Sequence, residues 1–154
     1  LTQAVGRAGR GSKAGEAVIQ TYMPEHYSIQ TAAKQDYDAF YEQEILYREL
    51  MGYPPVDEML GIYLSGKDLE KLESCAEQLA EWIRNAHVEG LCLIGPADAA
   101  LARKNDSNRK VIYMKHEKKI ILLKIKKLLE QQIAGTDNWN DIFIQFDYNP
   151  LQAY

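Results

Sequence analysis

The sequence of 154 residues has no apolar run long enough to cross a membrane, and no targeting segment is visible. No apolar run exceeds four residues, and one of these runs, residues 120–123, is followed at once by a lysine. Only two cysteines occur, Cys75 and Cys92, and they lie far apart without the CxxC spacing of a zinc site. Because each lies in an apolar pattern, buried free thiols in a reduced cytoplasm are favoured over a disulfide.

A catalytic triad is also missing. The three histidines, His26, His87 and His116, are scattered, and none forms a recognisable set with a carboxylate and a nucleophile. We therefore expect no separate catalytic activity of that kind. Apolar residues make up 46% of the chain and ten are tyrosines, so we expect one or two small globular domains. Trp82 and Trp139 are expected to anchor the core rather than to stack on a ligand.

The net charge of −4 hides an asymmetry. Residues 103–127 hold ten of the 18 lysines and arginines but only two of the 22 acidic residues, so this segment carries +8 and the rest −12. A polarised charge distribution is informative about binding partners rather than about fold.

A long helix is predicted over residues 25–51. Pro24 suits a first helical turn, and Gly52 followed by Tyr53-Pro54-Pro55 ends the helix, because proline cannot continue it. The residues recurring at every fourth position are Ile29, Ala33, Tyr37, Tyr41 and Ile45.

The remaining chain predicts a small α+β unit. Helices are expected over residues 69–83 and 118–133, and strands over 59–64, 91–94, 109–115 and 142–146, with 99–103 extending along a sheet edge. Gly95-Pro96 is expected to close the second strand, and residues 105–108 form a turn cluster. The order β-α-β-β-α-β predicts a ferredoxin-like sandwich, in which two helices cover one face of an antiparallel sheet.

The first residues, Gln3-Ala4-Val5-Gly6-Arg7-Ala8-Gly9-Arg10, resemble motif VI of superfamily 2 helicases. Arginine presents a fixed fork of donors to phosphate oxygens, and glycine lets backbone approach closely. The alternative is a flexible basic tail. A strand expected over residues 16–22 favours the helicase interpretation. In that interpretation the chain begins inside motif VI and carries only part of an ATP site.

Further motifs make the resemblance specific. They are the strand at residues 16–22, the helix with Tyr37, Phe40, Tyr41 and Glu44, then Gly52-Tyr53-Pro54-Pro55, and Gly95-Pro96-Ala97. In this order they resemble the C-terminal end of the primosomal protein N′ family of bacterial replication-restart helicases, over essentially the whole chain. Three parts are then expected: residues 1–24 from the second helicase lobe, 25–52 as a connecting helix, and 53–154 as a C-terminal domain.

The resemblance implies a 3′→5′ ATP-dependent DNA helicase that recognises abandoned replication forks and reloads the replicative helicase. Its implied partners are forked or branched DNA, the single-stranded DNA-binding protein, and primosome and helicase-loading proteins in the cytoplasm. ATP and magnesium are its implied cofactors, with zinc bound outside these residues. The C-terminal domain is implied to have a ribosomal-protein-like α/β fold that helps to bind branched DNA.

By the same resemblance, Gln3, Gly6 and Gly9 would contact nucleotide, while Arg7 and Arg10 would be catalytic, with Arg10 in the finger position. The sequence has no Walker A lysine, no DEAH-type acidic box and none of the family's zinc-binding cysteines. We therefore expect no ATPase activity from these residues alone. Residues 1–22 are expected to be disordered or held by a neighbouring chain, because a strand without neighbours must be paired or covered.

Two interpretations of the basic segment stay open, DNA-phosphate binding and an ordinary solvated surface. The DNA-binding candidates are Arg103, Lys104, Arg109, Lys110, Lys115, Lys118 and Lys119. The turn at 103–110 lacks the aromatic residues usual in the family, so phosphate contact is expected there rather than base stacking. An alternative function is a protein-interaction module that docks on the motor lobe or on the single-stranded DNA-binding protein. The motif VI resemblance argues against a third, a free-standing RNA-binding domain.

Overall fold

The computed structural model describes residues 16–104 and 106–151, without the side chains of residues 103 and 104. The chain divides into two compact units, Leu1–Met51 and Gly52–Tyr154. The motif VI residues, Gln3 to Arg10, lie outside the described residues, as does most of the expected helicase-lobe remnant.

The described start of the N-terminal unit has no strand, so the prediction of a strand over residues 16–22 is wrong. A strand persists only where a neighbouring strand takes up its backbone hydrogen bonds. No paired segment of this kind is found in the part of this unit that the structure describes. Most of the side chains from Glu16 to Met23 are exposed.

The single long helix predicted over residues 25–51 is also wrong, because the chain forms two helices, α2 (Tyr27–Lys34) and α3 (Tyr37–Met51). Gln35 between them is left-handed, with φ of 56°, and its backbone N–H closes α2 on the carbonyl of Ala32. The Asp36 carboxylate then accepts the backbone N–H of Ala39 at 3.0 Å and starts α3. Capping at Gln35 and Asp36 therefore ends one helix and starts another, although the spacing of apolar residues continues across these two positions.

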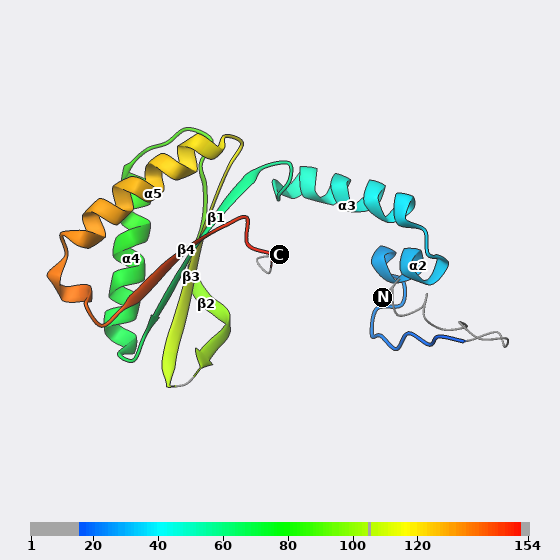
Figure 1. Ribbon diagram of the computed structural model, residues 1–154, viewed down its shortest axis with the longest axis horizontal. Coiled ribbons are helices and arrows are strands. Elements are labelled where there is room, and N and C mark those ends of the chain that lie inside the picture. The colour runs from blue at the N-terminus through cyan, green and yellow to red at the C-terminus, as the bar shows by residue number, and fades with distance from the viewer. Residues whose placement is uncertain (1–15, 105, 152–154) are drawn as a thin grey trace. The chain divides into compact units, whose positions relative to one another are not determined.

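The C-terminal unit contains the predicted series of elements (Figure 1). Its four strands pair antiparallel throughout, in the order β2-β3-β1-β4, which confirms the expected antiparallel sheet. The elements are β1 (Glu58–Gly66), α4 (Leu69–Asn85), β2 (Cys92–Lys104), β3 (Ser107–His116), α5 (Lys119–Ala134), the 3-10 helix η1 (Asp137–Trp139) and β4 (Phe143–Tyr148).

Strand β2 does not close at Gly95-Pro96 as expected but continues to Lys104. Its pairing with β3 is irregular after Ile94 and again after Asp98. Gly95 has φ of 96°, and a Cβ there would lie 2.8 Å from the Val111 carbonyl oxygen, so the irregular stretch requires glycine. Figure 1 shows the end of β2 bending away from the two helices.

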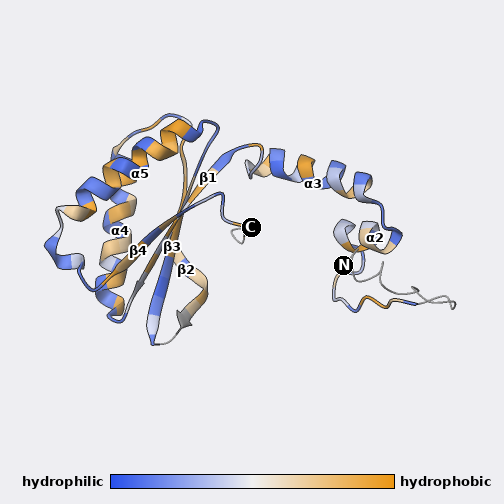
Figure 2. Ribbon diagram, in the orientation of Figure 1, coloured by the Kyte–Doolittle hydropathy of each residue, from blue (hydrophilic) through white to orange (hydrophobic). Residues whose placement is uncertain are grey.

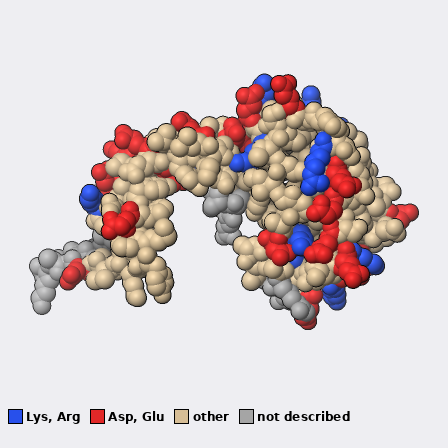
Figure 3. Space-filling model, turned by 180° about the vertical axis from the view of Figure 1, so that it is seen from behind, with Lys and Arg blue, Asp and Glu red and all other residues tan. Residues whose placement is uncertain are grey.

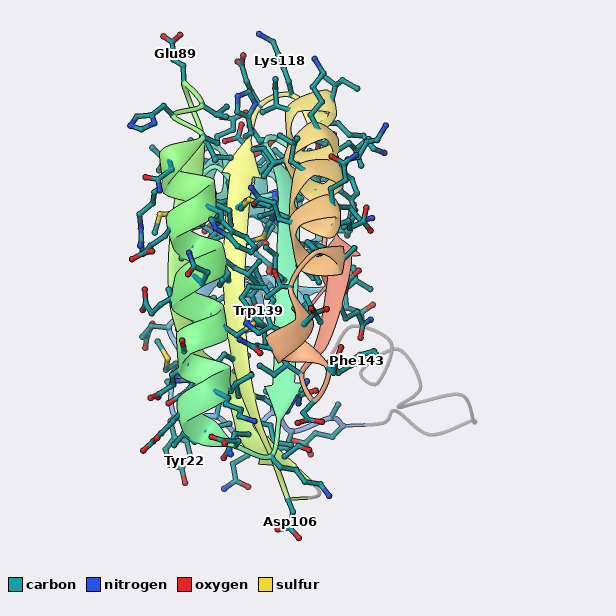
Figure 4. The ribbon with its side chains drawn as sticks, turned by 90° about the vertical axis from the view of Figure 1, so that its left-hand side faces the viewer. Tyr22, Glu89, Asp106, Lys118, Trp139 and Phe143 are labelled. Carbon is teal, nitrogen blue, oxygen red and sulfur yellow. The ribbon has the colours of Figure 1, made fainter. Side chains whose placement is uncertain are left out.

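The core lies between the sheet and the two helices, which cover one face side by side (Figure 4). Alternate residues of β1 and β3 point into it, and both helices turn an apolar stripe toward them while polar residues lie outside (Figure 2). The buried residues are Leu60, Ile62, Leu64, Leu72, Cys75, Ala76, Leu79, Ala80, Ile83, Ile112, Met114, Leu122, Ile125 and Leu129. The residues between them on β1 and β3 therefore face the other side, here called the open face.

Candidate nucleic-acid interface

The structure divides the seven predicted DNA-binding residues between opposite ends of the C-terminal unit. The β2–β3 turn around Asp106 lies at one end and Lys118 at the other (Figure 4). The ten residues of β3 separate them, a span of about 30 Å. Arg103 and Lys104 lie at the turn, where β2 pairs with Asn108 and Ser107, but their side chains are not described.

Lys110 is used within the fold. Its ammonium lies 2.9 Å from Glu73 on α4 and 2.9 Å from Asp98 on β2, and only 15% of its side chain is exposed. The hydrogen bonds to these two carboxylates, first that to Asp98, raise the pKa of Lys110. Lys110 therefore connects three elements on the helix-covered side of the sheet.

Lys115 is buried on the open face, with 9% of the residue exposed. Its ammonium lies 4.5 Å from the centroid of the Tyr53 ring, which is cation–π geometry. The contact holds the segment after Gly52 against the end of β3, so this charge does not stand free at the surface.

Helix α5 presents the other lysines, including Lys118 and Lys119. Lys118 is 67% exposed and pairs with Glu117 at 2.9 Å, and the Lys119 ammonium lies 4.4 Å from the centroid of the Tyr148 ring. Lys124 and Lys127 are exposed and make no ion pair with any residue in the described ranges. From the side seen in Figure 3, both signs of charge occur on the C-terminal unit, whereas α3 is mainly acidic or uncharged.

The start of α5 conflicts with the usual charge preference of helices. A helix N-terminus carries partial positive charge and favours acidic residues. Yet α5 has no acidic residue in its first turn and no side-chain hydrogen bond at its N-cap, Lys118. In contrast, α4 has Asp68 as its N-cap and Glu70 in its first turn. The N-terminal end of α5 therefore has no acidic cap, and the carboxylate just before it, Glu117, pairs with Lys118.

The open face of the sheet holds a feature that the sequence did not reveal. Tyr63 on β1 and Tyr113 on β3 have ring centroids 6.1 Å apart, with an interplanar angle of 87°. They line an open hollow of about 680 Å³ together with Arg109, the only DNA-binding candidate found there among described side chains. Its other lining residues are Ala99, Ala100, Leu101, Gln145, Asp147, Tyr148, Asn149, Pro150 and Leu151.

The two tyrosines are electrostatically coupled. Burial raises the pKa of Tyr63, and a side-chain hydrogen bond with Tyr113 raises it further. Strand alternation could have identified both residues, because each lies between two core residues of its strand, Ile62 and Leu64 or Ile112 and Met114. What the sequence could not supply is the register that brings the two strands together.

The other predicted features are placed as follows. Trp82 and Trp139 pack against the core with ring centroids 5.3 Å apart, as expected of core anchors. Cys75 is buried, and burial raises its pKa to about 12. Cys92 is exposed, so the expectation of two buried thiols is wrong: Cys92 begins the edge strand β2 and points toward the open face.

Two kinds of site are not found in the described part of the chain. No cluster of three or more histidine, cysteine, aspartate or glutamate side chains there could hold a metal ion. No described helix is long and apolar enough to span a membrane.

Comparison with known proteins gives a consistent set of relatives. The family model "Primosomal protein N C-terminal domain" matches residues 49–151. The replication restart protein PriA of Bacillus subtilis is 35% identical over 152 residues, covering 97% of this chain and 19% of that protein. The proteins of the same name from Haemophilus influenzae and Synechocystis are 30% and 29% identical, covering 96% and 98% of this chain and 20% and 18% of those proteins. The chain thus spans about a fifth of these relatives.

Proposed function

Because the chain belongs to the family of the primosomal protein N C-terminal domain, we propose that it forms the DNA- and partner-binding end of a replication-restart helicase. The complete protein would be an ATP-dependent 3′→5′ helicase that acts at abandoned replication forks with primosome proteins. The residues present here would bind branched DNA without hydrolysing ATP. The strand order and the two helices on one face agree with a ferredoxin-like sandwich as the scaffold.

The observation that carries the DNA-binding proposal is the row of lysines along α5, of which Lys124 and Lys127 are exposed and make no ion pair with a described residue. The helix begins with two lysines where acidic residues would stabilise it, and Lys124 and Lys127 extend the charge along its exposed side. Lysines that offset no acidic partner leave an electrostatic field available to phosphates. Of the predicted residues, we retain Arg109, Lys118 and Lys119 as contacts and assign Lys110 and Lys115 to the fold. Arg103 and Lys104 remain candidates.

In the complete protein, Gln3, Gly6 and Gly9 would contact nucleotide and Arg7 and Arg10 would act on its phosphates. ATP and magnesium would bind there, between the two lobes of the motor. Zinc would bind outside this chain. These roles come from the resemblance of the first residues to motif VI.

The proposal is tested with fluorescently labelled forked DNA and the double variant Lys124→Gln/Lys127→Gln. If both lysines contact phosphates, the plot of log K against log salt should lose about 1.8 units of slope, since each duplex phosphate contact contributes about 0.9. Anisotropy titrations at several salt concentrations measure this slope. Both lysines are exposed, so their replacement should leave thermal unfolding nearly unchanged.

The matched control is Lys67→Gln/Lys71→Gln, which makes the same change in charge at exposed positions near the start of α4. The control should keep the wild-type slope. Equal losses in both variants would show that only net charge matters, and would remove the assignment of a contact surface on α5.

A second candidate function is protein docking, which a different observation favours. Ile120, Leu123 and Leu128 on α5 are 56%, 40% and 56% exposed, and they alternate with the lysines. An apolar and basic surface suits an acidic peptide with apolar side chains. Titration with the acidic tail peptide of the single-stranded DNA-binding protein distinguishes the two functions. Tight peptide binding without binding of forked DNA would select docking.

A further inference from the structure

We propose that the open face of the sheet binds unpaired bases of single-stranded DNA, with Tyr63 and Tyr113 as stacking surfaces and Arg109 as a phosphate contact. The inference rests on the proposed function, since it specifies the form of DNA bound, but it uses a different surface from α5. It also supplies the aromatic contacts that the β2–β3 turn lacks.

The two rings are fixed over a glycine on the central strand. Gly61 pairs with Tyr113 across β1 and β3, and a Cβ at this glycine would lie 2.9 Å from the Tyr63 ring and 3.3 Å from the Tyr113 ring. A side chain at this position would require the Tyr63 ring to shift and would crowd the Tyr113 ring. The rings remain partly exposed, so they are pre-oriented at low entropic cost and keep surface for a ligand.

The polar groups around the rings suit nucleotides. Arg109 lies on the same side of β3 as Tyr113 and makes no ion pair with any residue that the structure describes, so its guanidinium can contact a phosphate. Gln145 can donate to and accept from base edges, and the Asp147 carboxylate can accept from base amino groups.

The position of the rings favours a nucleic-acid strand over a protein partner. Aromatic side chains on the two central strands of a four-stranded sheet are the arrangement by which RNA-recognition domains stack bases. Here β1 and β3 are the central strands. Stacking also tolerates any base, because each base has a π face. The lining also brings charged and polar groups, Arg109, Gln145 and Asp147, next to the rings, as recognition of a nucleotide requires.

The test uses the full chain and a labelled oligothymidylate of about twelve nucleotides, which has no duplex structure. Tyr113→Leu keeps apolar bulk but removes the ring, and it should weaken binding about 5- to 150-fold. Tyr113→Phe should retain most of the affinity. An abasic oligonucleotide of equal length should bind to the wild type at least as weakly as oligothymidylate binds to Tyr113→Leu, because it has no base to stack on either ring. Arg109→Gln should lower the salt slope by about 0.7, the value for one single-strand phosphate.

The matched control is Tyr22→Leu, because Tyr22 is fully exposed in the N-terminal unit and should not affect binding. Should Tyr113→Leu not fold, photocrosslinking of wild type to an iododeoxyuridine oligonucleotide gives an independent result. Crosslinks at Tyr63 or Tyr113 would support the site. Equal affinity for the abasic oligonucleotide, or crosslinks elsewhere only, would overturn it, as would tighter binding of oligouridylate.

The outcomes separate this inference from the proposed function. If binding of forked DNA depends on Lys124 and Lys127 but not on Tyr113, the proposed contact surface on α5 is supported and the stacking site is refuted. Oligothymidylate binding that depends on Tyr113 but not on the lysines would do the reverse.

Discussion

Asp68 and Lys118 occupy the same position at the start of two helices that cover the same sheet, yet only one is suited to it. The Asp68 carboxylate accepts the backbone N–H of Lys71 at 3.1 Å, whereas Lys118 makes no such bond. Both residues have the extended backbone of an N-cap. The lysine is therefore a residue at which stability and the proposed DNA binding oppose each other.

Replacing Lys118 with aspartate tests that opposition. Lys118→Asp should stabilise the protein by about 0.5–2 kcal/mol, because aspartate caps the helix and complements its dipole. The lost ion pair to Glu117 is exposed and contributes little. Urea unfolding measures the gain, and anisotropy with forked DNA should show weaker binding. A stabilised variant with unchanged affinity would remove Lys118 from the DNA contacts.

At the level of elements, a side-chain network fastens β4 to the start of β1. The Glu58 carboxylate accepts hydrogen bonds from the Tyr148 hydroxyl and, at 2.9 Å, from the Asn149 side-chain amide. The side-chain amide oxygen of Asn149 accepts the Met59 backbone N–H at 2.8 Å, and Asn149 has φ of 48°. Asparagine tolerates this left-handed backbone, so it continues the pairing beyond the end of the edge strand.

This network predicts a pH dependence of stability. The hydrogen bond from Tyr148, and then that from Asn149, lowers the pKa of Glu58 below its ordinary value of about 4.5. A carboxyl with a lowered pKa stabilises the fold above its unfolded pKa, and this contribution is lost as the pH falls through the folded value. Glu58→Gln should therefore be less stable than wild type at pH 7, with the difference shrinking below pH 4.5. Urea unfolding at several pH values measures it, and a difference that stays constant would contradict the prediction.

Periodicity was a sound guide where tertiary packing agrees with it. The stripe of α4 and the alternation in β1 and β3 predicted their elements, because one face of each is buried. It failed at Gln35, where a left-handed residue and the Asp36 cap end one helix and begin another. It failed again at Gly95, where the residue expected to end β2 permits a bulge within it.

The candidate site was less predictable than the fold, because charge along a sequence does not state which side a residue faces. Lys110 and Arg109 are adjacent, but strand alternation sends the first toward α4 and the second to the open face. The contact between the Tyr63 and Tyr113 rings depends on a strand register that no local pattern encodes.

For the whole chain, the two units differ in how much they bury. Helix α3 has no buried residue, and Tyr37, Tyr41 and Leu50 on it are 70%, 52% and 78% exposed. The C-terminal unit has a continuous core from β1, β3, α4 and α5, against which partly buried residues of β2 and β4 pack. Isolated helices of about 15 residues are marginal in water, so the units should differ in local stability.

Amide hydrogen exchange on the full chain should reveal this difference. Amides of α3 should exchange several orders of magnitude faster than those in the middle of α4, since α4 opens only with its core. Mass spectrometry of peptic peptides measures both in one sample. Comparable protection of the two helices would mean that α3 is stabilised by contacts other than those described.

Lys110 and Lys115 both make contacts within the fold, and this affects how scanning mutagenesis of the protein is interpreted. Removing Lys110 would leave Glu73 and Asp98 facing each other without their shared cation, and removing Lys115 would leave the Tyr53 ring without the cation over it. Both replacements would reduce the fraction of folded molecules, and with it the apparent affinity for any ligand. When charged residues of this protein are replaced one at a time, the measured affinities report ligand contacts only for variants whose concentration of folded, active protein has been determined by titration to saturation.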